Sequence, residues 1–288
     1  MLFSFEEFSR MLRRKPGKCS FAVGDVVFYR AGLYRTAKKI IVMLFALLSI
    51  SALAQSEKAC FTADRPGTTT GVDVLPKGRV QWETGMAYER VRLGDLTSTT
   101  WTLNSSLFRW GFSQLAELRL QADYLYNTFE GDHHHGFSNV AIGTKARLFE
   151  GWQAVPAISL LGNVFIPGSR EAAFMLSDWS GQMGLLFQNE ITPWLSLGYE
   201  TDIYWYSQAK PTFFWGFCLT FQATKRCSLM VEEFNNQYYG LHDNWLELGA
   251  AFQIAPRLQL DISTDISLNY PKDYFNLMLG VAWQINKK

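Results

Sequence analysis

The chain has 288 residues, of which 48% are hydrophobic and 15% aromatic, so it can bury a sizeable core and is not intrinsically disordered. Lys and Arg total 27 against 26 for Asp and Glu, and this balance, with no dense basic block, excludes nucleic acid or an acidic polymer as a partner. The four cysteines have no CxxC spacing and no nearby histidine pair, which argues against a zinc site or a dense disulfide framework.

The first recognisable element is a secretory signal peptide at residues 38–54, KKIIVMLFALLSISALA. Two lysines precede an uncharged run that ends in an A-x-A cleavage pattern at Ala52 and Ala54. An anchoring helix is the alternative, but the uncharged run is shorter than the roughly 20 residues that span a bilayer. We interpret residues 1–37 as an N-terminal extension created by a misassigned gene start, the alternative being a basic tail in front of the signal.

Residues 55–79 follow the signal and carry no alternation of their own. Pro66 and Gly67 predict a turn. We expect this segment to pack at or inside the periplasmic mouth of the domain that follows, as a periplasmic or plug segment.

From residue 80 to residue 285, apolar and polar residues alternate with the period of a β-strand. In AELRLQADYLY, for example, Leu118 and Leu120 share one face while Glu117 and Arg119 share the other. No sustained helical periodicity interrupts the pattern. About twelve such segments occur, at 80–91, 99–110, 115–126, 138–149, 154–166, 179–191, 195–206, 212–223, 227–237, 244–254, 257–268 and 274–285.

The length of these segments and the composition of their two faces favour a membrane barrel over a soluble sandwich. Each segment has about the 9–11 residues, or slightly more, of a tilted strand that crosses a bilayer, whereas soluble strands average about 5–6. The polar face carries Gly, Ala, Ser and Gln among isolated charges, which suits a narrow wet interior, and the apolar face ends in aromatics such as Tyr126 and Trp283. Short turns alternate with stretches that we expect to be long loops, namely NTFEGDHHHGF, PGSREAAFMLSD and NQYYGLHD. The predicted fold is an all-β, antiparallel, up-and-down transmembrane β-barrel of the outer-membrane type with about twelve strands.

Charged residues on the polar parity are the candidates for a functional site, as the lining of the lumen. They could pair with one another to fill the interior, or they could line a wet path. Lys145 and Arg147 are expected near Glu117, Arg119 and Asp123, because sequential strands of such a barrel are neighbours. The complete set of candidate lumen-lining residues is Glu83, Glu117, Arg119, Asp123, Lys145, Arg147, Glu190, Glu200, Asp202, Glu232, Glu247, Asp261 and Asp265.

Other reactive side chains have simpler interpretations. The run His133-His134-His135 could chelate a transition metal loosely, but we interpret it as an exposed polar loop. Cys218 could be a reactive thiol, and we interpret it as a small buried filler. Every histidine, His242 included, falls in a predicted loop, so none is placed beside a strand serine for hydrolysis. We therefore predict no catalytic, cofactor-binding or metal site.

Five stretches of the chain carry a resemblance to a known family: ADRPG (63–67), LPKGRVQWETG (75–85), GFSNVAIGTKARL (136–148), PAISLLGNVFIPG (156–168) and PRLQLDISTDISLN (256–269). They resemble the outer-membrane transporters named after the meta-pathway of phenol degradation. The resemblance implies an outer-membrane barrel over roughly residues 61–285. Two departures are Ser138-Asn139, where the family commonly has Gly-Asp, and the extension of the chain beyond its last strand as Asn-Lys-Lys.

The leading functional hypothesis is a non-enzymatic channel or transporter for passive passage of small molecules, hydrophobic or aromatic ones included, in the outer membrane of a Gram-negative bacterium. Its expected partners are membrane lipid and a small-molecule solute, and the oligomeric state is left open. A structural barrel with a plugged lumen is the first alternative. An outer-membrane lipid hydrolase is the second.

Overall fold

The structure is a computed structural model that describes residues 61–285, except 169–173, 176, 177, 208, 239, 240 and 270–272. The predicted extension (1–37), the predicted signal peptide (38–54) and residues 55–60 lie outside the described residues. In the described part there is no helix that is long and apolar enough to cross a membrane.

Twelve β-strands make up the described domain, and their lengths run from 9 residues in β5 to 18 in β4. Each contains one of the alternating segments expected from the sequence, or nearly all of it, except β5, whose 9 residues are shorter than the segment expected at 154–166. The strands are β1 (Val80–Leu93), β2 (Leu96–Gly111), β3 (Ala116–Phe129), β4 (Asp132–Phe149), β5 (Ala157–Phe165), β6 (Ser180–Thr192), β7 (Leu195–Tyr206), β8 (Thr212–Thr224), β9 (Cys227–Tyr238), β10 (Leu241–Ala255), β11 (Leu258–Ser267) and β12 (Tyr274–Ile285).

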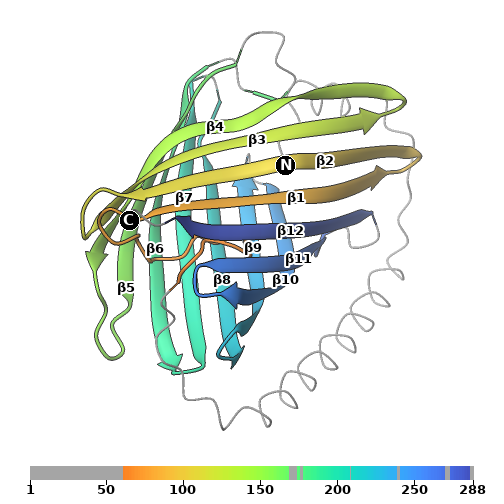
Figure 1. Cartoon of the computed structure of the whole chain (residues 1–288). Helices are drawn as coiled ribbons and strands as arrows, with labels where there is room; N and C mark the ends of the chain where they lie inside the picture. Colours follow the sequence, from red (N-terminus) through yellow and green to blue (C-terminus); the bar gives the residue numbers. More distant parts are fainter. Residues whose placement is uncertain are drawn as a thin grey trace. The chain divides into compact units, whose positions relative to one another are not determined.

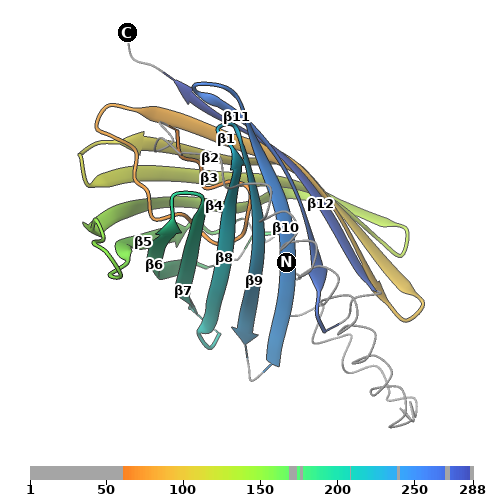
Figure 2. The ribbon, with the colours of Figure 1, turned by 90° about the horizontal axis from the view of Figure 1, so that it is seen from below.

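The strands form a closed antiparallel barrel in which each strand pairs with its neighbours in the chain (Figures 1 and 2). Closure is made between the first strand and the last, from Val80 opposite Ile285 to Val91 opposite Tyr274. A closed sheet has no unpaired edge, so every strand can satisfy its backbone hydrogen bonds inside a hydrocarbon layer. The prediction of an up-and-down barrel of about twelve strands is confirmed.

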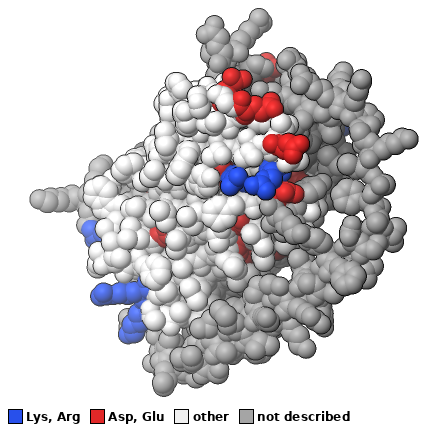
Figure 3. Space-filling view, turned by 90° about the vertical axis from the view of Figure 1, so that its right-hand side faces the viewer, with Lys and Arg blue, Asp and Glu red and all other residues white. Residues whose placement is uncertain are grey.

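The two faces of the barrel have the reverse of the polarity found in a soluble protein. In β11, Leu260 and Ile262 on the outside are each 41% exposed, whereas Asp261 and Asp265 on the inside are 4% and 6% exposed. In Figure 3, charged side chains gather in a few places on the described surface, and broad uncharged areas surround them. An apolar exterior and a polar interior are expected of a barrel in lipid, so the protein belongs in the outer membrane.

Two of the loops expected from the sequence are instead strand pairs that extend to the tips of hairpins. Between β3 and β4 the turn is Glu130-Gly131, and both residues have positive φ (50° and 89°), which favours a two-residue hairpin turn. Pairing therefore continues to Phe129 opposite Asp132. Between β9 and β10 only residues 239 and 240 remain outside the strands. Of the three long loops expected, the one between β5 and β6 is the one that the structure retains.

Bulges in β2 and β4 change which residues face inward. In β2 the pairing with β3 skips one residue between Thr102 and Asn104, so side chains before and after this point follow opposite parities. In β4 a similar shift lies near Asn139, whose φ of 50° is in the left-handed region that asparagine tolerates better than most residues. Asn139 also donates from Nδ2 to Oδ2 of Asp123 at 2.8 Å. The departure from the family pattern at this position is thus compatible with the barrel.

Candidate functional site

Residues 61–79, called here the inner segment, run through the interior of the barrel before the chain enters β1 (Figures 1 and 2). Hydrogen bonds join this segment to strands around the ring, among them β1, β3, β5, β7, β9 and β11. The strand wall also leaves room for the backbone of the segment. At Gly111, a Cβ atom would collide with the carbonyl oxygens of Leu75 and Pro76.

Asp64 of the inner segment is surrounded by three basic side chains from neighbouring strands. Its Oδ2 accepts a hydrogen bond from Nη1 of Arg119 at 2.5 Å, and its Oδ1 accepts one from Nζ of Lys145 at 2.9 Å. Nη1 of Arg109 lies 3.6 Å from Oδ1, and the backbone N–H of Asp64 donates to Oε2 of Glu83 at 3.0 Å. Burial works to raise the pKa of Asp64, but the three cations outweigh burial and hold this pKa well below its usual range. Asp64 is therefore an ionised anchor for the segment.

Glu117 connects the same cations to the inner segment by a second route. Arg109 donates two parallel hydrogen bonds to it, from Nε to Oε1 at 2.9 Å and from Nη2 to Oε2 at 3.0 Å. Arg119 donates to Oε1 at 2.9 Å, and the backbone N–H of Leu75 donates to Oε2 at 2.7 Å. Nη1 of Arg109 also donates to Oε1 of Glu83 at 2.8 Å. Bidentate, charge-assisted bonds of this kind are among the stronger polar contacts in proteins.

We call the interior face of β1–β4 the balanced wall, because the charges that meet there match. Three bases (Arg109, Arg119 and Lys145) face three acids (Asp64, Glu83 and Glu117), and the ion pairs among them lie between 2.5 and 3.8 Å. All six are buried or nearly so, and their mutual pairing offsets much of the cost of removing them from water.

Arg109 is a central residue of this network that the sequence did not indicate. Trp101 and Leu103 in the same strand face outward, and simple alternation would place Arg109 outward with them. The bulge in β2 reverses the parity, and Arg109 is 0% exposed on the inside. An arginine among lipid-facing aromatics was the available signal, since a charge at that depth would be costly.

The interior face of β7–β11 is called the acidic wall. Arg65 of the inner segment is the cation paired with it among the described residues, through Nη2 and Oδ1 of Asp261 at 3.3 Å. The hydroxyl of Thr68 donates to Oε2 of Glu247 at 3.0 Å. The buried carboxylates of the wall are Glu200, Asp202, Glu232, Glu247, Asp261 and Asp265.

Uncharged donors of the inner segment make the other contacts with the acidic wall. The backbone N–H of Thr69 and its hydroxyl both donate to Oε1 of Glu232 at 2.7 Å. The backbone N–H of Thr70 donates to Oε2 of Glu200 at 2.5 Å. These bonds orient the segment, but they bring no positive charge to the wall.

The predicted lumen-lining residues have three different surroundings. Arg147 bonds to Asp73 at 2.7 Å and to Glu150 at 3.0 Å, away from the network around Asp64, so the expected cluster with Glu117 includes Lys145 but not Arg147. Glu190 is exposed and accepts a hydrogen bond from a glutamine of its own strand. The others are buried: Glu83, Glu117, Arg119, Asp123, Lys145, Glu200, Asp202, Glu232, Glu247, Asp261 and Asp265. Their role as the lining of a solute path stays a prediction.

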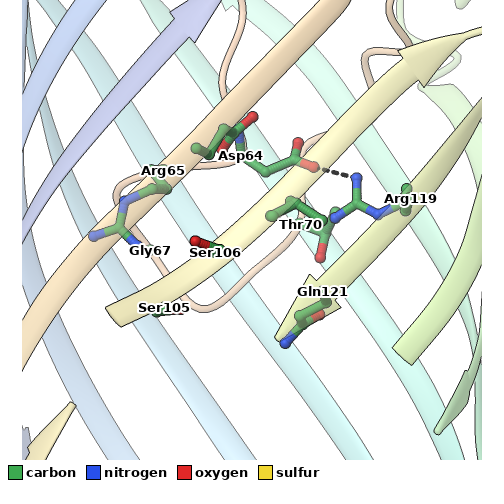
Figure 4. A pocket seen from close by; sticks show the side chains of 10 residues that line it. Asp64, Arg65, Gly67, Thr70, Ser105, Ser106, Arg119 and Gln121 are labelled. Carbon is green, nitrogen blue, oxygen red and sulfur yellow. Dashed lines mark hydrogen bonds and ion pairs between the residues drawn. The ribbon is translucent and has the colours of Figure 1, made fainter. Parts of the chain in front are cut away.

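A cavity of about 150 Å³ remains between the inner segment and the β1–β3 side of the barrel (Figure 4). This volume holds several water molecules. Asp64, Arg65 and Thr70 line it from the segment, and Arg119 and Gln121 line it from β3. The inner segment and the strand wall thus leave a polar space beside Asp64.

The histidines lie on strands, which corrects their assignment to loops. His133 and His135 belong to β4, and His242 belongs to β10, because the hairpins are longer than expected. Nδ1 of His135 lies 3.0 Å from the hydroxyl of Tyr124. Within the described part of the chain there is no group of His, Cys, Asp and Glu that could hold a metal ion.

Comparison with known proteins agrees with this architecture. The family model described as "Putative MetA-pathway of phenol degradation" matches residues 63–285. Among solved structures, the COG4313 outer membrane channel from Pseudomonas putida F1 has a TM-score of 0.59 and 14% identity, over 77% of this chain and 99% of that one. The KdgM porin has a TM-score of 0.45 and 12% identity, over 71% and 99%. The CymD monoaromatic hydrocarbon channel has a TM-score of 0.43 and 6% identity, over 73% and 89%. No curated protein matches the chain.

Proposed function

Because the chain belongs to the family described as "Putative MetA-pathway of phenol degradation", as the resemblance of its segments implies, we propose that it is a passive outer-membrane channel for small molecules. In this proposal the inner segment closes the channel at rest. The phenol pathway in the family's name supports the inclusion of small aromatic solutes. The protein acts by selective passage rather than by catalysis.

The observation that carries the proposal is the way in which the inner segment is held. Many of its described contacts with the walls are polar, as between Asp64 and Lys145 or Thr69 and Glu232, beside one apolar cluster of Val72 with Leu161 and Leu186. Hydrogen bonds from neutral donors, such as those of Thr69, can be exchanged for water when the segment moves. The walls that would then be exposed carry carboxylates and bases, which suit a hydrated path.

The charges of the interior support a preference for cations. With the segment displaced, the acidic wall has no basic side chain of its own among the described residues of β7–β11 that point inward. Carboxylates that line a wet path between walls of low dielectric attract cations and repel anions. We expect neutralisation of Glu200 and Asp202 together to reduce this preference.

A structural barrel with a plugged lumen is the second candidate. The observation in its favour is that the inner segment bonds to strands around the ring, among them β1, β3, β5, β7, β9 and β11. The two candidates differ in whether the closed state is permanent.

Planar-bilayer recordings of the purified barrel separate the two. We expect a small conductance from the full chain and a larger one from a variant that lacks residues 61–76, with cations favoured in both. If both proteins stay closed to ions while they retain the β-sheet spectrum of a folded barrel, the channel proposal is wrong and the structural barrel is the better account.

A further inference from the structure

Three neighbouring strands bring a row of carboxylates together at one level of the interior. Glu247 of β10 is paired with Glu232 of β9 on one side and with Asp265 of β11 on the other. Directly paired residues have Cβ atoms about 4.5–5.5 Å apart and point to the same face. The exposed fractions of these residues are 0%, 0% and 6%. Glu232, Glu247 and Asp265 are called here the acidic row.

The acidic row has more acceptors than the structure supplies donors. Glu232 and Glu247 each accept from a threonine of the inner segment through one oxygen, and Asp265 accepts from Nδ2 of Asn276 at 3.1 Å. The second oxygen of each carboxylate, and Oδ1 of the 7%-exposed Asn276, are buried without a hydrogen-bond partner. Buried polar atoms without partners are costly and rare in folded proteins, so this group of acceptors calls for a donor.

A second row of inward side chains lies next to the acidic row, on the side away from the end of the barrel where β1 begins and β12 ends. Phe234 of β9 is paired with Trp245 of β10, and their rings stack at 6.2 Å between centroids with 14° between planes. Tyr274 of β12 packs against Trp245 at 4.4 Å and 68°. Phe234 comes two residues after Glu232, and Trp245 comes two residues before Glu247, so ring faces and carboxylates are adjacent along each strand. Phe234, Trp245 and Tyr274 are called the aromatic row.

These two rows have complementary preferences. Carboxylates side by side repel one another unless a positive charge or a proton lies between them. Aromatic faces attract a cation within about 6 Å of the ring centre. The nearby cation of the inner segment, Arg65, is paired with Asp261, four residues before Asp265 in β11. The described residues hold no group of three or more His, Cys, Asp or Glu side chains that could bind a metal ion, whereas an organic cation with N–H donors fits both the acceptors and the rings.

We propose that the acidic row and the aromatic row form a binding site for a protonated aromatic amine. The ammonium group donates to the unpartnered oxygens of Glu247 and its neighbours, and the aromatic body packs against Trp245 and Tyr274. Tyr274 is partly exposed, and entry is from its end of the barrel. The inference deepens the proposed function by naming a class of solute, and it rests on that function only for the passage of the bound amine, not for binding.

Calorimetric titration of the purified full-length protein in detergent tests the site without any need for conduction. Benzylammonium is the probe, and benzyl alcohol and benzoate are its neutral and anionic counterparts. We expect binding of benzylammonium alone. Glu247→Gln removes a charge-assisted hydrogen bond and should weaken binding roughly tenfold or more. Trp245→Leu should also weaken it, by roughly fivefold or more if the cation–π contact contributes about 1 kcal/mol.

Matched controls are available for both variants. Glu150→Gln removes a carboxylate whose side chain is 73% exposed, and Trp152→Leu removes a 71%-exposed indole, so both should bind benzylammonium as the wild type does. Three results would each contradict the site. The wild type could bind benzyl alcohol as tightly as benzylammonium, it could fail to bind benzylammonium, or a folded Glu247→Gln variant could bind benzylammonium with unchanged affinity. If the barrel conducts ions but does not bind benzylammonium, this inference is wrong and the proposed channel is unaffected. If it binds benzylammonium but does not conduct, the site is supported and the proposed channel is wrong.

Discussion

The balanced wall and the acidic wall hold the same inner segment by different means. On the balanced wall, Asp64 meets Arg119 and Lys145 within 2.9 Å, and the ion-pair network joins three acids to three bases. On the acidic wall, Glu232 receives a backbone amide and a hydroxyl, and most carboxylates have no cation beside them. The balanced wall thus holds the inner segment through charge pairs, whereas the acidic wall has carboxylate oxygens that lack hydrogen-bond donors.

This difference indicates how a barrel that is closed by its inner segment can open. Breaking a buried ion pair leaves an uncompensated charge and is expensive, whereas hydrogen bonds from neutral donors are replaced by water at little net cost. We therefore expect the attachment of the segment to depend mainly on Asp64. In the proposed function, the carboxylates of the acidic wall are then available to the solute.

The largest effect is expected from Asp64→Asn, which removes the counter-charge of three buried cations. It should lower the free energy of unfolding by roughly 3–5 kcal/mol, the usual cost of breaking a buried pair. Urea unfolding in detergent measures this. The control is Asp73→Asn, because Asp73 has a 37%-exposed side chain and its pair with Arg147 should contribute about 1 kcal/mol or less. Equal losses in both variants would contradict the role of Asp64 as the main anchor of the inner segment.

The same isosteric change should have a large effect on the balanced wall and a small one on the acidic wall. Glu117→Gln removes the partner that Arg109 binds through two parallel bonds, and it should cost about 3 kcal/mol of unfolding free energy. Glu247→Gln relieves the repulsion within the acidic row and should change stability by about 1 kcal/mol or less, in either direction. Comparison of the two urea midpoints is sufficient. A larger loss of unfolding free energy from Glu247→Gln would mean that the acidic wall, and not the balanced wall, holds the inner segment.

Arg109→Lys tests whether the balanced wall depends on the charge of Arg109 alone or also on its parallel hydrogen bonds to Glu117. Lysine keeps the charge but cannot form the two parallel bonds to Glu117 while also reaching Glu83. We expect a loss of roughly 1–2 kcal/mol, smaller than for the loss of Asp64. A stability equal to that of the wild type would show that charge alone holds the network.

The smallest effect concerns pH, and its sign follows from the depressed pKa of Asp64. A carboxyl whose pKa is lower in the folded state contributes stability that is complete above its unfolded pKa of about 3.9 and disappears as the pH falls toward the folded value. The difference in unfolding free energy between wild type and Asp64→Asn should therefore be constant from pH 7 to about pH 5 and shrink below about pH 4. Shrinkage already between pH 7 and pH 5 would contradict the assigned role of the cations.

The sequence predicts most of the fold because one face of each strand meets lipid and the other does not. Alternation placed Glu247 and Asp261 on the inner face, where the structure has them. It misassigned the His133–His135 stretch, because a two-residue turn at Glu130-Gly131 lets the strands continue where composition indicated a loop.

The candidate site was less predictable, since its contacts join residues distant in the chain. Arg109 was hidden by a bulge that reverses parity, and a bulge has no periodic signal. Asp64 lies 81 residues from Lys145, in a segment without a repeating pattern, so its place among three cations depends on tertiary structure alone.

Single-channel current through Asp64→Asn, recorded beside wild type and Glu247→Gln at the same voltage and salt, tests most directly whether the balanced wall keeps the barrel closed. The account predicts more frequent or longer openings for Asp64→Asn, and no such increase for Glu247→Gln, because only the first variant loses the anchor of the inner segment. An Asp64→Asn barrel that is folded and remains as closed as the wild type would contradict it.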